Sequence, residues 1–124
     1  MKSGKIWGHT EELHKSDVFE LHRLVVVPGG MCSKHLHNHK YNVFYVEEGD
    51  LSVEVWKRDY DLIDRTELQS GDKMQVVPGE FHRFRSDKGC VAYEWYFPAP
   101  LSEDIVRESC GSVTQDNCLE TDRD

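Results

Sequence analysis

The sequence lacks any long apolar run. A membrane-spanning helix needs roughly 18 or more consecutive apolar residues, and no window of this 124-residue chain approaches that length. The opening stretch "MKSGKIWGHTEEL" also has no apolar core of the kind that a secretory signal requires. These absences predict a soluble, cytoplasmic protein with no membrane partner.

Cysteine pairs and long helical patterns are missing as well. The four cysteines contain no CxxC pair, so the sequence indicates neither a zinc knuckle nor a disulfide framework, and we expect free thiols. No helical stripe of useful length appears before Leu101. A short helix is predicted only at "LSEDIVRE", near the C-terminal end of the chain.

Positive charge is scarce, especially toward the C-terminus. The formal net charge is -8, and seven acids against two arginines lie between Leu101 and Asp124. Such a surface repels phosphate backbones, so nucleic acid is not an expected partner. The last residues are also poor in large apolar side chains. We therefore predict a folded domain over 1–106 and a disordered acidic tail over 107–124.

The rest of the chain is rich in short strand patterns. Hydrophobic residues make up 38% of the sequence, which is enough for one core. Strands are predicted at "VFELHRLVVV", "SKHLHNH", "NVFYVEE", "LSVEVWK", "IDRTEL", "KMQVVP", "FHRFRS" and "CVAYEWYF". Turns are expected at "EEGD", "RDYD", "QSGD" and "SDKG". This pattern predicts an all-β fold, an antiparallel sandwich or barrel.

Histidines recur at every second position in "KHLHNH". If this segment is a strand, His35, His37 and His39 share one face. His82 shares a face with Phe84, whose apolar side chain indicates the inner side, so His82 is expected to meet the others inside a barrel. Convergent neutral nitrogens are what a first-row divalent metal needs. The remaining histidines fit no shared pattern and are interpreted as surface residues: His9, His14 and His22.

The histidine spacing resembles the two motifs of the cupin family. The first, G(x)5HxH(x)4E(x)6G, matches Gly29, His35, His37 and Gly49, with Asn42 where the family has glutamate. The second, G(x)5PxG(x)2H(x)3N, is approached by "GDKMQVVPGEFHRFRS". There Gly71 and His82 are correctly separated, Pro78 is displaced by one place, and Ser86 replaces asparagine.

The cupin resemblance implies a jelly-roll β-barrel, an antiparallel double sheet, with a divalent metal ion held by His35, His37 and His82. The metal is left open among zinc, manganese, iron and nickel. Asn42, through its amide oxygen, and His39, through its phase, are the two candidates for a fourth ligand. The family also makes a homodimer the expected assembly and a small molecule the expected ligand.

A further resemblance, to the barrel of type II mannose-6-phosphate isomerases, rests on fewer residues. Trp7-Gly8, His37 and His39 match that family, with Lys40 in place of arginine. The sequence departs from it at three positions, where His35, Asn42 and Val43 replace glutamine, glutamate and histidine. The resemblance implies a metal-dependent isomerase or epimerase acting on a sugar or sugar phosphate.

Three functions stay open on the sequence. The isomerase needs a general base, for which Glu94 and Glu47 are the carboxylates in predicted strands. A three-histidine iron dioxygenase is favoured by the lost glutamate, and a non-catalytic cupin that binds a small ligand is favoured by the poor fit to either pattern. Alternation places Glu94 and Tyr96 opposite to Tyr93 and Trp95, and leaves open which pair lines the interior.

Overall fold

The computed structural model describes residues 2–57 and 62–98, which form strands and connecting segments without a helix. The strands are β1 (Lys2–Lys5), β2 (Gly8–Lys15), β3 (Glu20–Val26), β4 (Lys40–Trp56), β5 (Ile63–Gln69), β6 (Lys73–Val76), β7 (Phe81–Arg85) and β8 (Cys90–Pro98). The all-β class is therefore confirmed. The expected helix "LSEDIVRE", the acidic tail and the expected turn at 58–61 lie outside the described residues. No helix able to cross a membrane occurs in the part of the chain that the structure describes.

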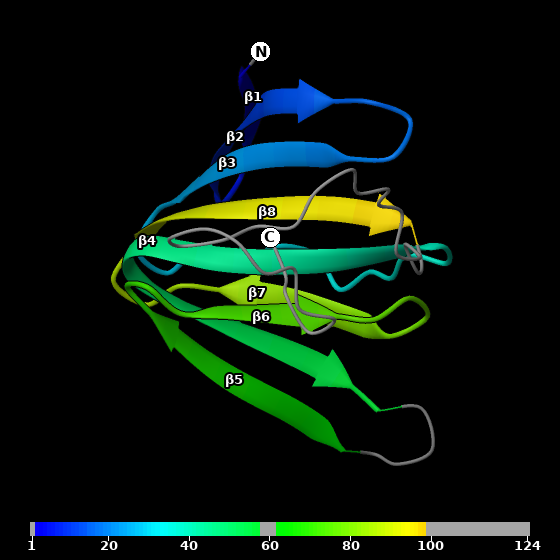
Figure 1. Cartoon of the computed structure of the whole chain (residues 1–124). Helices are drawn as coiled ribbons and strands as arrows, with labels where there is room; N and C mark the ends of the chain where they lie inside the picture. Colours follow the sequence, from blue (N-terminus) through cyan, green and yellow to red (C-terminus); the bar gives the residue numbers. More distant parts are fainter. Residues whose placement is uncertain (1, 58–61, 99–124) are drawn as a thin grey trace, which may run out of the picture.

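Two antiparallel sheets share strand β4, which passes from one into the other (Figure 1). The first sheet has the order β1-β2-β3-β8-β4-β6, and the second has the order β5-β4-β7. Their inner faces enclose one apolar core, whose members include Leu24, Val26, Phe44, Val46, Leu51, Val53, Phe84 and Ala92. Alternate residues are buried at the end of β3 and the start of β8, whereas β4 is buried at consecutive positions over 42–44 and 51–55, where it lies between neighbouring strands of the closed double sheet.

The segment "EEGD" is a bend inside β4, so the turn predicted there is wrong. The pairing of β4 with β8 slips between Val46 and Glu48, and Gly49 has a φ of 89°. A Cβ atom on Gly49 would lie 2.1 Å from the carbonyl oxygen of Gly89, so the position requires glycine. Val46 and Leu51 are both fully buried on either side of the bend, which keeps the strand continuous instead of ending it.

The N-terminal hairpin of β1 and β2 was not predicted from the sequence. Both strands are mostly polar and exposed, because they extend the first sheet beyond the core instead of covering it. Trp7, in the turn between them, packs edge-on against Phe84 with ring centroids 4.9 Å apart. The turns expected at 69–72 and 86–89 are present.

The interior of the barrel is polar toward one end. The inward positions are apolar at the other end, but at this end they are polar on three neighbouring strands: Glu20 and His22 on β3, Glu94 and Tyr96 on β8, and Asn42 on β4. Cross-strand register aligns them, since His22 pairs with Glu94 and Asn42 pairs with Tyr96. The face left open by the sequence is thereby settled: Glu94 and Tyr96 point inward.

Candidate metal centre

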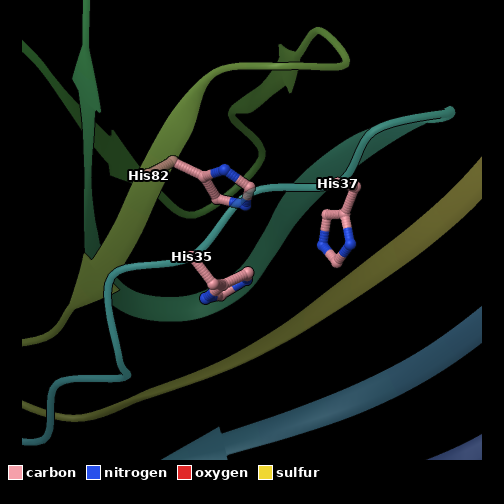
Figure 2. A group of neighbouring side chains, drawn as sticks. All are labelled: His35, His37 and His82. Atoms are coloured by element: carbon pink, nitrogen blue, oxygen red, sulfur yellow. The ribbon is translucent and has the colours of Figure 1, made fainter.

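Three imidazoles converge at the polar end of the barrel. His35 and His37 come from the segment before β4 and His82 comes from β7 (Figure 2). One nitrogen from each ring lies within 4.8 Å of the other two. Three tetrahedral ligands with bonds of about 2.0–2.1 Å lie about 3.3–3.4 Å apart. The rings would therefore need to approach one another by up to about 1.5 Å to share an ion.

The segment that carries two of these histidines is not the β-strand predicted over 33–39. Within it, only His35 pairs with β7, through backbone hydrogen bonds to and from His82 with N to O distances of 3.0 and 2.8 Å. The His37 carbonyl accepts a hydrogen bond of 2.7 Å from the Gly79 amide. The segment is thus attached at His35 and His37 to the β7 region, which brings the third histidine alongside.

Backbone carbonyls orient two of the three rings. His35 Nδ1 donates to the Ser33 carbonyl at 2.8 Å, and His82 Nδ1 donates to the Glu80 carbonyl at 3.0 Å. A carbonyl can only accept, so Nδ1 carries the proton in both residues and Nε2 keeps its lone pair. Hydrogen bonds of this kind typically fix the tautomer of a metal-binding histidine.

His37 completes the set with a nitrogen that has no partner. Its Nε2 atom is buried and makes no hydrogen bond within the described residues. Burial, together with the neighbouring His35 and His82, lowers the pKa of His37 to about 4. Burial also lowers the pKa of His82. Neutral imidazoles are the form that binds metal, and an ion would satisfy the orphaned nitrogen.

Asn42, one of the two candidates for a fourth ligand, lies directly beside this cluster. Its side chain is 1% exposed, and its Oδ1 atom is 3.2 Å from His82 Nε2. Its Nδ2 group donates to Glu94 Oε2 at 3.4 Å. The donor set of three neutral nitrogens and one amide oxygen fits a divalent cation.

His39, the other candidate for a fourth ligand, is placed elsewhere. It lies at a bend before β4 and lines a second cavity of about 240 Å³ with Val18, Phe19 and Phe97. The alternation that would have aligned it with His37 requires a regular strand, which this segment is not. The structure therefore does not bring His39 into the cluster.

The cluster borders a cavity of about 550 Å³. Its polar lining includes Glu20, His22, Lys40, Glu94 and Tyr96. Burial raises the pKa of the Glu94 carboxyl group, and burial together with that carboxyl group raises the pKa of Tyr96. The cavity thus combines titratable groups of both signs with the histidine cluster.

Two sequence interpretations change with this cavity. Glu47, a candidate base, is exposed on the outer face, where the Tyr93 hydroxyl donates to it at 3.4 Å, whereas Glu94 lines the cavity. His22 was interpreted as a surface residue, but its side chain is only 17% exposed and lines the cavity. Alternation with the buried Leu24 was the sequence signal that could have placed it inside.

The double sheet and the histidine cluster define a β-barrel with a candidate metal site in its interior. The chain belongs to the cupin family, whose domain model matches residues 22–96. No curated protein matches the sequence.

Several solved structures share this fold. KdgF from Halomonas sp. is 13% identical with a TM-score of 0.68, over 81% of this chain and 89% of that one. An RmlC-like cupin from Shewanella frigidimarina is 24% identical with a TM-score of 0.62, over 73% and 76%. The capsular polysaccharide assembling protein CapF from Staphylococcus aureus is 19% identical with a TM-score of 0.71, over 78% of this chain and only 28% of CapF. These similarities concern the fold.

Proposed function

We propose that the protein binds one divalent metal ion through His35, His37 and His82, with the Asn42 amide oxygen as a fourth ligand. The observation that carries this proposal is the buried His37 Nε2 atom, which has no hydrogen-bond partner among the described residues, beside two rings whose Nε2 atoms carry no proton. A bound divalent cation supplies Lewis-acid stabilisation of negative charge on a substrate oxygen.

We propose further that the substrate is a sugar or sugar phosphate and that the reaction is an isomerisation or epimerisation. The cavity of about 550 Å³ is in the usual size range for small-molecule sites. Lys5 and Lys40 line it and offer positive charge to a phosphate group. The resemblance to the mannose-6-phosphate isomerase barrel and the shared fold with CapF, a capsular polysaccharide assembling protein, support the same substrate class.

A three-histidine iron dioxygenase is the second candidate. The observation that favours it is the donor set itself, which among the described residues contains three imidazoles and no carboxylate ligand. Such a set leaves the full charge of the ion available to bind an anionic substrate. A non-catalytic cupin would bind a small ligand in the cavity without carrying out either reaction.

Metal analysis and two activity assays distinguish these functions. Elemental analysis of the wild type should give about one equivalent of metal. The His37→Ala variant should lose most of this metal, whereas the control His39→Ala should keep it. Equal metal content in wild type and His37→Ala would reject the proposed site.

The zinc-loaded or manganese-loaded protein should promote deuterium exchange from D2O into mannose 6-phosphate, glucose 6-phosphate or fructose 6-phosphate. NMR measures this exchange. Oxygen uptake by the iron-loaded protein without such exchange would select the dioxygenase.

We also propose that the protein is a cytoplasmic homodimer, as membership of the cupin family suggests. Light scattering coupled to size-exclusion chromatography should return twice the mass of the chain. A single-chain mass across the micromolar range would reject the dimer.

A further inference from the structure

A histidine and a carboxylate form a pair on the inner face of β3, apart from the metal centre. His22 Nε2 lies 2.9 Å from Glu20 Oε2. The two residues alternate inward with Leu24 and Val26, which are buried in the core. The pair therefore occupies the polar continuation of a core-lining strand, and both side chains line the cavity.

The pair fixes which nitrogen of His22 carries a proton. The hydrogen bond from His22 and the nearby Lys40 ammonium, 3.8 Å away, hold the pKa of Glu20 below its usual range, so this group is an ionised acceptor. His22 Nε2 therefore donates, and Nδ1 keeps its lone pair. Within the described residues, Nδ1 makes no hydrogen bond. An imidazole oriented by a carboxylate, with its second nitrogen free, is a suitable general base.

Tyr96 connects this pair to the histidine cluster. Its ring lies edge-on to His22, with centroids 6.1 Å apart, and edge-on to His37, with centroids 4.9 Å apart. His22 and His37 line the same cavity. A small molecule that fills this cavity is therefore in reach of both the cluster and His22.

Glu94, the second carboxyl group that lines the cavity besides Glu20, is already engaged. Its carboxyl group accepts the hydrogen bond from Asn42 Nδ2 at 3.4 Å and a second from Tyr96. These contacts suit a carboxyl group that holds Asn42 against His82. His22 has no comparable structural task, since its only hydrogen bond within the described residues is to Glu20.

We propose that His22 is the proton-transfer residue and that Glu20 is its positioning residue, an assignment that rests on the proposed sugar isomerase or epimerase function. The substrate class is an α-hydroxy carbonyl compound. His22 Nδ1 removes the proton from the carbon beside the carbonyl group. The C–H bond breaks, an N–H bond forms, the freed pair becomes a C=C bond, and the carbonyl pair moves onto oxygen to give an enediolate.

The proton then returns to carbon. In an isomerisation it returns to the former carbonyl carbon, while the hydroxyl proton of the neighbouring oxygen moves to the oxyanion. In an epimerisation it returns to the original carbon from the other face. The positive charge on the His22 imidazolium is stabilised by Glu20 throughout. No oxidant or reductant is consumed.

The test uses metal-loaded full-length protein and the exchange assay in D2O with the three hexose phosphates. His22→Asn and His22→Gln should lower the exchange kcat by about 100-fold or more, with metal content and melting temperature unchanged. Glu20→Gln should lower kcat by about tenfold or more with little change in KM, and Glu20→Asp should recover part of it. His14→Asn, at an exposed position on β2, is the matched control.

Each outcome decides the assignment. Exchange within threefold of wild type in a folded His22→Gln variant would overturn it, and loss of exchange in Glu94→Gln alone would transfer the role to Glu94. An effect of Glu20→Gln on KM or melting temperature without an effect on kcat would reject the positioning role. If the wild type itself exchanges none of the probes, the proposed isomerase function fails, and the assignment fails with it.

Discussion

His82 Nε2 and Asn42 Oδ1 lie 3.2 Å apart, and both atoms present lone pairs when His82 donates through Nδ1 to the Glu80 carbonyl. Two acceptors at this distance repel each other unless a positive charge lies close to both. The buried Nε2 atom of His37 makes no hydrogen bond within the described residues, and an ion would supply its partner. The metal proposal accounts for both atoms with one ion.

Asn42→Glu tests the fourth ligand. A carboxylate would add negative charge next to the ion, so we expect metal affinity to rise by about tenfold or more and phosphate affinity to fall. In the absence of metal, the new carboxylate would lie beside Glu94, which now accepts from the Asn42 amide, and the melting temperature should drop. Chelator competition, phosphate titration and thermal unfolding measure these effects.

The control for this variant is Asn42→Ala, which removes the amide oxygen without adding charge. Its metal affinity should fall below that of wild type. Unchanged metal affinity in both variants would place Asn42 outside the coordination sphere.

Glu54→Gln tests an ion pair on the outer face of β4. The Glu54 side chain is 1% exposed and accepts from Arg83 Nε at 2.7 Å and Arg65 Nε at 3.1 Å. Hydrogen bonds from Arg65 and Arg83 lower the pKa of Glu54 below 4.5 in the folded protein. A lowered folded-state pKa stabilises the protein above the unfolded value, and this contribution is lost as the pH falls through the folded value.

Urea unfolding at a series of pH values measures this contribution. At pH 7 the Glu54→Gln variant should be less stable than wild type by about 2 kcal/mol, because its amide replaces a charged acceptor. The difference should shrink as the pH falls below 4.5. The control Glu12→Gln, at an exposed position on β2, should follow wild type. A difference between Glu54→Gln and wild type that stays constant with pH would contradict the assignment.

The sequence predicts the fold class and the meeting of the three histidines, because both depend on spacing. Strand alternation and the distance between the two cupin motifs are properties of the chain alone. The same alternation, applied to β3, would also have placed Glu20 and His22 on the inner face with Leu24. Their polarity obscured that signal, because polar residues on a strand are usually exposed.

Other features depend on tertiary contacts that no local pattern encodes. His39 shares the spacing of His35 and His37, yet only His35 forms a bridge to β7, so the strand phase is not maintained. The glutamates and glycine of "EEGD" favour a turn locally. The chain bends there without reversing, because Gly49 packs against Gly89 of the neighbouring connection and Leu51 continues into the second sheet.

Two glycine substitutions separate backbone conformation from close packing. Gly29 and Gly49 both have positive φ, of 84° and 89°. A Cβ atom on Gly29 would meet nothing within 4 Å, whereas one on Gly49 would lie 2.1 Å from the Gly89 carbonyl oxygen. Gly29→Ala should therefore lower the free energy of unfolding by about 1 kcal/mol through the left-handed conformation alone. Gly49→Ala should lower it by about 3 kcal/mol or more, since backbone must also move.

We expect the Gly49 bend to affect the geometry of the metal centre as well. β4 carries Asn42 on one side of Gly49 and pairs with His82 through Val55 on the other. A shift at the bend should change the distance between Asn42 and His82, so we expect Gly49→Ala to weaken metal binding as well as stability. Urea unfolding and chelator competition on both variants measure the two effects. Equal losses in Gly29→Ala and Gly49→Ala would show that the Gly89 connection moves aside and that the bend does not fix the site.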